Sequence, residues 1–130
     1  MNNKIEKIFT SEKTIPVVFA TDKNFIPYMY VAITSLIENS SPHNNYDIVI
    51  LYRDIDEYNQ NKLKKLCKEN ISIRFFNMTE NMEKYKGVWY THWSYTEAMY
   101  YRFIIPQIFE SYEKILYLDG DIIINCDIAE

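Results

Sequence analysis

Apolar runs alternate with stretches of helical spacing along the first half of the chain, and this order limits the fold more than any other feature. Three runs rich in β-branched and aromatic side chains predict buried strands: residues 15–20, 47–52 and 71–76. Residues 25–39 and a stretch beginning near Asp54 have the period of helices. Strands that alternate with helices predict a mostly parallel sheet flanked by helices and joined by right-handed crossovers. We therefore expect an α/β, Rossmann-like nucleotide-binding architecture.

The two helices of this pattern differ in character. The first is apolar around most of its circumference, and we expect it to be buried on most sides. Its main stripe contains Tyr28, Val31, Ala32, Ser35 and Leu36, and Met29, Ile33 and Ile37 widen this stripe. Asp54 precedes Glu57 by the spacing of a capping box and predicts the start of the second helix, which Asn70 ends. The apolar face of this helix is expected to contain Leu63, Leu66 and Cys67, with its lysines in solvent.

The rest of the chain has weaker periodicity. Residues 77–95 show no clean period, and we assign no role to His92 there. Residues 96–103 regain helical spacing before Ile105-Pro106 ends or bends the helix, and a fourth strand follows before residue 119. Arg102 lies between apolar neighbours, where a buried guanidinium needs an anionic partner, either a local carboxylate or a ligand.

Length and composition predict one soluble globular domain, with residues 1–14 as a loosely held arm and 15–130 as the domain. Of the 130 residues 48% are hydrophobic and 25% charged, and no apolar stretch reaches the roughly 18 residues of a membrane span. No apolar segment of a secretory signal follows the N-terminal lysines, so we expect a cytoplasmic location. The net charge of −4 without a basic block argues against a nucleic-acid partner. Cys67 and Cys126 are expected to be reduced structural thiols.

Two carboxylates one residue apart lie in the stretch Tyr117-Leu118-Asp119-Gly120-Asp121, between apolar runs at 114–116 and 122–124 that each predict a strand. Ligands of parallel sheets bind outside the carboxyl ends of the strands, and paired oxygen ligands there suit a divalent cation that bridges to phosphate. Asp-Gly between apolar runs is equally the signal of a β-hairpin, which is the more ordinary interpretation of the five residues alone. Both interpretations stay open at this point.

Missing motifs narrow the ways in which a nucleotide could be held. The chain has only two glycines, Gly87 and Gly120, so it contains neither a G-x-G-x-x-G fingerprint nor a phosphate-binding P-loop. No serine lies in the G-x-S-x-G context of hydrolases. Any nucleotide must therefore be bound without a glycine cradle.

Three stretches taken together resemble glycosyltransferase family 8, the retaining nucleotide-sugar-dependent transferases with the GT-A fold. They are VVFATDKNF at 17–25 with VAITSL at 31–36, YYRF at 100–103, and LYLDGDIII at 116–124. Their joint order and spacing are specific, and the resemblance covers nearly all of residues 15–128. It implies a GT-A nucleotide-diphospho-sugar transferase fold that is incomplete in this chain.

The resemblance also implies which residues bind the nucleotide sugar: Ala20, Thr21, Asp22, Asn24, Phe25, Arg102, Asp119, Gly120 and Asp121. By this resemblance Asp22 accepts from the uracil edge and Phe25 stacks on the base, where the family more often has tyrosine. Arg102 would contact the diphosphate or the sugar and is the one candidate catalytic residue. Asp119 and Asp121 would be the DxD pair that binds Mn²⁺ or Mg²⁺.

The function implied is metal-dependent transfer of a hexose, glucose or galactose, from a UDP-sugar to an acceptor such as a saccharide or lipopolysaccharide, with retention. Family members continue past this motif and supply a further metal ligand and the acceptor site. We therefore expect residues 15–130 to be the donor-binding half, which binds a UDP-sugar but does not transfer the sugar by itself. The alternative is a non-catalytic nucleotide-binding or nucleotide-sugar-binding domain or a degenerate remnant.

Overall fold

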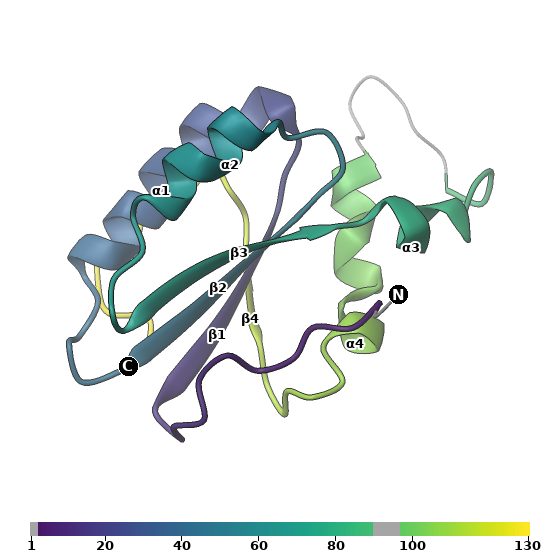
Figure 1. Ribbon diagram of the computed structural model, residues 1–130. Coiled ribbons are helices and arrows are strands. Elements are labelled where there is room, and N and C mark those ends of the chain that lie inside the picture. The colour runs from purple at the N-terminus through teal and green to yellow at the C-terminus, as the bar shows by residue number, and fades with distance from the viewer. Residues whose placement is uncertain (1–2, 90–96) are drawn as a thin grey trace.

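A four-stranded parallel sheet forms the centre of the molecule. The structure, a computed structural model, describes residues 3–89 and 97–130. The strands are β1 (Thr14–Ala20), β2 (Asn45–Tyr52), β3 (Ile71–Asn77) and β4 (Leu116–Leu118), and their order across the sheet is β3-β2-β1-β4 (Figure 1). Val18 of β1 pairs with Val49 on one side and with Tyr117 on the other, all in parallel. The predicted α/β architecture with a Rossmann-like parallel sheet is confirmed.

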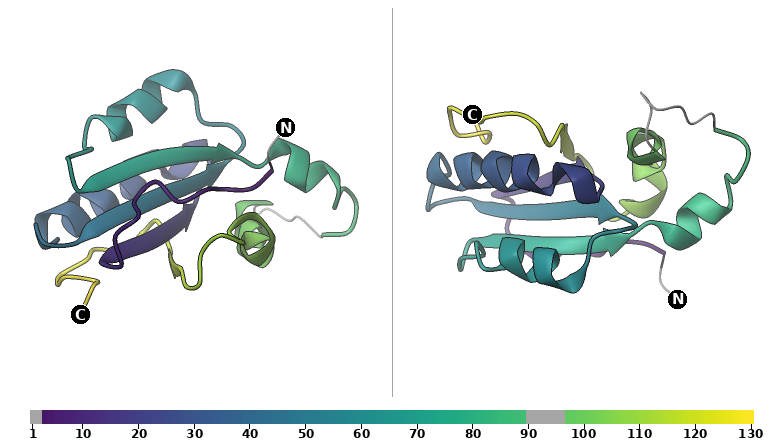
Figure 2. Two further views of the ribbon diagram at one scale, coloured as in Figure 1. Left: turned by 60° about the horizontal axis from the view of Figure 1, so that its bottom comes forward. Right: turned by 90° about the horizontal axis from the view of Figure 1, so that it is seen from above.

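Helical segments cover both faces of this sheet. A 3₁₀ turn, η1 (Lys23–Phe25), leads into α1 (Ile26–Glu38), and α1 lies with α2 (Glu57–Lys64) on one face (Figure 1). The other face carries α3 (Thr79–Glu83), the 3₁₀ helix η2 (Glu97–Phe103) and α4 (Ile105–Ile108), which two further views separate from α1 and α2 (Figure 2). No helix in the described part of the chain is long and apolar enough to cross a membrane.

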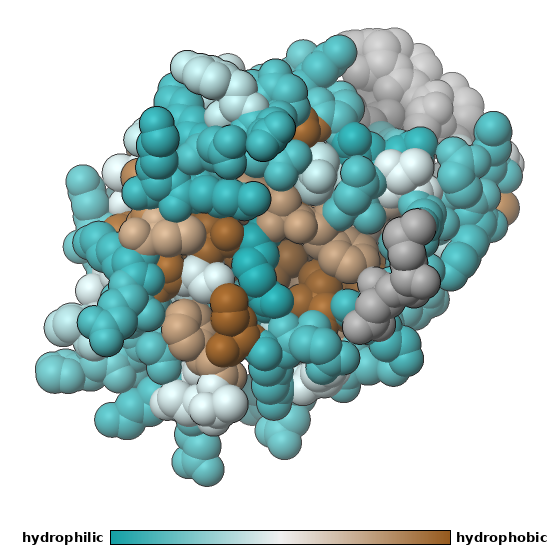
Figure 3. Space-filling model, viewed as in Figure 1, coloured by the Kyte–Doolittle hydropathy of each residue, from teal (hydrophilic) through white to brown (hydrophobic). Residues whose placement is uncertain are grey.

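The central strands β1 and β2 are buried on both faces, because helical segments cover both sides of the sheet and successive side chains point to opposite sides. One core lies between the sheet and α1 with α2, and its strand residues include Val17, Phe19, Tyr46, Ile48 and Ile50. The second core lies under η2 and α4 and takes the intervening residues Val18, Val49 and Leu51. On the molecular face shown in Figure 3, hydrophilic side chains cover α2 and the rim, while hydrophobic ones gather over the sheet.

The buried face of α1 differs from the predicted stripe. Its buried residues are Ile26, Met29, Ala32, Ile33 and Leu36. Tyr28 and Val31 are 57% and 51% exposed, so their assignment to the core was wrong, as was burial on most sides. A helix that is apolar around most of its circumference has more than one possible core stripe, and only packing against the sheet chooses between them.

The boundaries of α2 also differ from the sequence prediction. Asp56 is the N-cap, and its Oδ1 accepts from the backbone N–H of Asn59 at 2.8 Å. Asp54 instead accepts from the backbone N–H of Lys23 at 3.3 Å. The helix ends at Lys64, well before Asn70, and Cys67 is exposed rather than packed.

The chain after the acidic motif is not a strand. Residues 122–125 run beside α1, where the backbone N–H of Ile124 donates to Ser35 Oγ and its carbonyl accepts from Asn39 Nδ2, both at 2.9 Å. The predicted strand at 122–124 and the hairpin interpretation of Asp119-Gly120 are therefore wrong. The predicted helix at 96–103 is a 3₁₀ helix from Glu97 onward, while Thr96 and His92 lie outside the described residues.

A buried charge cluster joins the N-terminal segment to the sheet. Asp47 of β2 is 1% exposed, and both of its carboxylate oxygens accept from Arg74 while Tyr112 donates to Oδ2 at 2.5 Å. Arg74 also donates to the carbonyl of Glu6 at 2.9 Å, and Ile5 is buried with its N–H bonded to Ile108 O at 2.7 Å. The described part of the arm is thus in contact with the domain, while its mobility stays a prediction.

The cap of α2 gives a first test. We expect Asp56→Ala to lower the free energy of unfolding by about 1 kcal/mol, because the first turn of α2 loses an acceptor for an N–H group that no other helical carbonyl can bind. Asp54→Ala is the matched control and should cost less, since Asp54 accepts only a longer bond outside the helix. Urea unfolding of the wild-type chain and the two variants measures both effects. A larger loss of unfolding free energy for Asp54→Ala would support the capping box predicted from the sequence.

Candidate functional site

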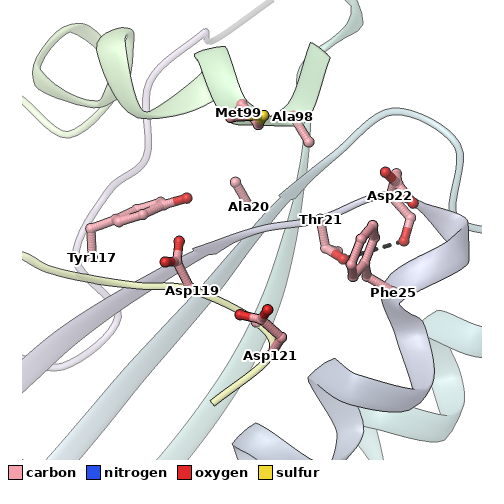
Figure 4. Close-up of a pocket in the computed structure, with 10 residues that line it drawn as sticks. Ala20, Thr21, Asp22, Phe25, Ala98, Met99, Tyr117, Asp119 and Asp121 are labelled. Atoms are coloured by element: carbon pink, nitrogen blue, oxygen red, sulfur yellow. Dashed lines mark hydrogen bonds between the residues drawn. The ribbon is translucent and has the colours of Figure 1, made fainter. Parts of the chain in front are cut away.

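The candidate site lies at the point where the order of strand addition reverses across the sheet. From β1 the chain adds β2 and β3 on one side, and β4 then pairs on the opposite side of β1. Ligands of parallel sheets bind at such a switch point, outside the carboxyl ends of the strands. A cavity of about 230 Å³ opens there, lined by Ala20, Thr21, Asp22, Phe25, Ala98, Met99, Tyr117, Asp119, Gly120 and Asp121 (Figure 4).

One wall of this cavity is the turn from β1 into α1. Thr21 is buried, and its N–H continues the sheet by donating to Leu51 O at 3.1 Å. Asp22 caps η1: its Oδ1 accepts from the N–H of Asn24 at 2.8 Å, and its carbonyl accepts from the N–H of Phe25 at 3.2 Å. These bonds leave the second carboxylate oxygen of Asp22 available and hold the ring of Phe25 at the edge of the cavity (Figure 4).

The opposite wall carries the two acids of the motif. Asp119 and Asp121 are exposed, and their carboxylates point toward the cavity (Figure 4). Neither accepts a hydrogen bond or forms an ion pair with any residue that the structure describes. Two free carboxylates side by side fit a hard divalent cation, which would offset their mutual repulsion. Within residues 3–89 and 97–130, however, no group of three or more His, Cys, Asp or Glu side chains comes together as a complete metal site.

Three lining residues were not predicted from the sequence: Ala98, Met99 and Tyr117. Tyr117 precedes Asp119 by two positions, so strand alternation could have placed both on one face. Burial raises the pKa of the Tyr117 hydroxyl, the negative charge of Asp119 raises it further, and Arg102 opposes the shift. Ala98 and Met99 lie on η2 in the long crossover between β3 and β4, and no local pattern marked them.

Two predicted site residues do not line the cavity. Asn24 is exposed and contributes its backbone N–H to Asp22. Arg102 is also exposed, with its guanidinium carbon 5.7 Å from the centre of the Phe103 ring. The argument that Arg102 is a buried cation in need of an anion was therefore wrong, because its apolar sequence neighbours Ile104 and Ile105 point into the core and Arg102 does not.

Gly120 allows the acidic turn to approach α1 closely. A Cβ atom at this position would lie 2.7 Å from the terminal methyl carbon of Met29 and 3.7 Å from its sulfur. Met29 is fully buried, so its side chain has little room to move away. The absence of a side chain at Gly120 thus fixes how near the two carboxylates lie to α1.

Comparison with known proteins agrees with this geometry. The family model described as glycosyl transferase family 8 matches residues 16–130. The chain belongs to this family. None of the curated protein sequences matches the chain.

Solved structures of glycosyltransferases share the fold. The bifunctional glycosyltransferase WbbM, in its apo structure, superposes with a TM-score of 0.83 at 28% identity over 98% of this chain and 22% of WbbM. The galactosyltransferase LgtC, in complex with donor and acceptor sugar analogs, gives 0.69 at 23% identity over 88% of this chain and 40% of LgtC. Mouse xyloside xylosyltransferase 1 gives 0.68 at 14% identity over 88% of this chain and 45% of that protein.

These likenesses show that this family 8 chain has the GT-A fold. The chain spans less than half the length of each of these three proteins.

The close contact below the acidic turn gives a second test. We expect Gly120→Ala to destabilise the fold by roughly 1 to 3 kcal/mol, because the added methyl group overpacks the contact with Met29. In a Met29→Leu background, which removes the terminal methyl carbon, the same change should cost much less. Unfolding free energies of the four proteins form a double-mutant cycle. Additive costs would show that Met29 is not what restricts position 120.

Proposed function

We propose that this chain is the donor-binding part of a metal-dependent glycosyltransferase that takes a hexose, glucose or galactose, from a UDP-sugar and transfers it with retention to a saccharide or lipopolysaccharide acceptor. The observation that carries the proposal is the cavity itself. It brings together, at the switch point of the sheet, an aromatic ring, the Asp22 carboxylate with one oxygen bonded to Asn24, and two carboxylates that pair with no described residue. The names of the neighbours, a galactosyltransferase among them, support sugar transfer.

The cavity residues divide into a base end and a phosphate end. Phe25 and Asp22 lie together at one end, and Asp119 and Asp121 lie across from them (Figure 4). A uracil ring would stack on Phe25 and donate to the free oxygen of Asp22. The diphosphate would then extend toward the two acids, which is the order of groups in a nucleotide sugar.

The chemistry follows from charge. Departure of UDP from the anomeric carbon places negative charge on the sugar-side phosphate. A Mn²⁺ or Mg²⁺ ion held by Asp119 and Asp121 would stabilise that charge as it develops. Arg102 does not line the cavity, and its positive charge opposes the rise of the Tyr117 pKa that burial and Asp119 cause. The expectation that these 130 residues bind a donor without transferring its sugar stays a prediction.

Calorimetric titration of UDP with and without Mn²⁺ tests the proposal. We expect UDP to bind appreciably only when Mn²⁺ is present, and Asp121→Asn to weaken that binding at least tenfold because one anionic ligand is lost. The control is Asp54→Asn, another exposed carboxylate, which does not line the cavity. An affinity for UDP that is the same with and without Mn²⁺ would favour the non-catalytic nucleotide-binding alternative. No binding under either condition would favour a degenerate remnant.

The base end gives an independent prediction. We expect Phe25→Ala to weaken UDP binding by roughly 1 to 3 kcal/mol, the contribution of a base stacked on an aromatic ring. Binding of Mn²⁺ alone should change little, because the ion does not contact that ring. Tyr28→Ala is the matched control: its ring lies 5.9 Å from that of Phe25 but outside the cavity lining. Equal losses from the two substitutions would contradict the stacking role of Phe25.

A further inference from the structure

We propose that the hydroxyl group of Tyr117 donates a hydrogen bond to the sugar-side phosphate of the bound nucleotide sugar. This inference rests on the proposed function and adds a donor-binding residue to it. In this proposal Tyr117 binds the leaving phosphate by a hydrogen bond, whereas the two acids would bind it through the metal ion.

The position of Tyr117 in the cavity is the first reason. Phe25 and Asp22 lie at one end, Asp121 and Asp119 follow, and Tyr117 lies at the other end with its hydroxyl directed into the cavity (Figure 4). A nucleotide sugar with its base on Phe25 and its diphosphate at the acids therefore presents its sugar-side phosphate to Tyr117.

The second reason is that no residue described by the structure accepts a hydrogen bond from the Tyr117 hydroxyl. Its side chain is half-buried, yet the hydroxyl makes no hydrogen bond to any residue in the described ranges. The hydroxyl is directed into the cavity and is open to solvent, so it is available to donate to a bound ligand. A tyrosine hydroxyl keeps its proton at neutral pH and can therefore act as a donor.

Elimination among the lining side chains is the third reason. The carboxylates accept but do not donate, and Ala20, Phe25, Ala98, Met99 and Gly120 have no polar side-chain atom to offer as a donor. The hydroxyl of Thr21 donates to the carbonyl of Asp22 at 3.2 Å. Tyr117 therefore supplies the one free side-chain donor among the described residues that line the cavity. A donor aimed at the leaving phosphate gains strength as negative charge develops there.

The experiment compares Tyr117→Phe with the wild-type chain in titrations of UMP and UDP in the presence of Mn²⁺. We expect the affinity for UDP to fall about tenfold, the usual effect of losing a hydrogen bond to a charged acceptor, and the affinity for UMP to stay within twofold. Tyr58→Phe is the matched control, since Tyr58 is 76% exposed on α2, away from the cavity. Thermal melts should not differ, because the Tyr117 hydroxyl bonds to no described residue.

The outcomes separate this inference from the proposed function. If the wild-type chain binds UDP with Mn²⁺ and Tyr117→Phe binds it equally well, the hydrogen bond is absent while the donor site stands. Equal losses for UMP and UDP would place the contact elsewhere and overturn the inference. A loss seen with a UDP-hexose but not with UDP would assign the hydroxyl to the sugar instead. If the wild-type chain does not bind UDP, both proposals fail together.

Discussion

Parallel pairing of β1 with β2 on one side and with β4 on the other is the constraint on which the site depends. Both pairings run in the same direction, so the carboxyl ends of β1 and β4 lie side by side at one edge of the sheet. The residues that follow these two ends, 21–25 after β1 and 119–121 after β4, supply most of the lining of the cavity there. Phe25 and the acidic motif, far apart in sequence, become neighbours for this reason alone.

Helix α1 holds the acidic motif in position through contacts along its length. Its N-terminal end follows Phe25, its buried Met29 contacts Gly120, and its C-terminal half binds the chain after the motif through Ser35 and Asn39. The motif is thus held before Asp119 by the pairing of β4 and after Asp121 by hydrogen bonds to α1. Because both flanks are fixed by the protein, the two carboxylates need no protein partner of their own and stay available to a ligand.

The sequence predicted the layered architecture because that information is local. The first two strands contain continuous apolar runs, the third alternates apolar with polar residues, and segments of helical spacing lie between the strands. Their order therefore specified an α/β sheet before any contact was known. The same locality explains the errors at α1 and α2. Apolar residues surround most of α1, so only packing against the sheet selects its buried face. Both Asp54 and Asp56 are suitable caps for α2, and Asp56 caps the helix while Asp54 accepts from the N–H of Lys23.

By itself, then, the sequence determined the fold class, the family resemblance and most of the candidate site, because the motifs at 20–25 and 119–121 are contiguous and chemically distinctive. Tertiary structure decided between a hairpin and a strand end at Asp119-Gly120, since residues 122–125 run beside α1 and bond to Ser35 and Asn39 instead of forming a return strand. It also decided that Tyr117, Ala98 and Met99 line the cavity and that Arg102 does not. Tyr117 is placed by the pairing of β4 with β1. Ala98, Met99 and Arg102 are placed by the long crossover that packs on the sheet, and such packing is a property of the assembled core rather than of any local pattern.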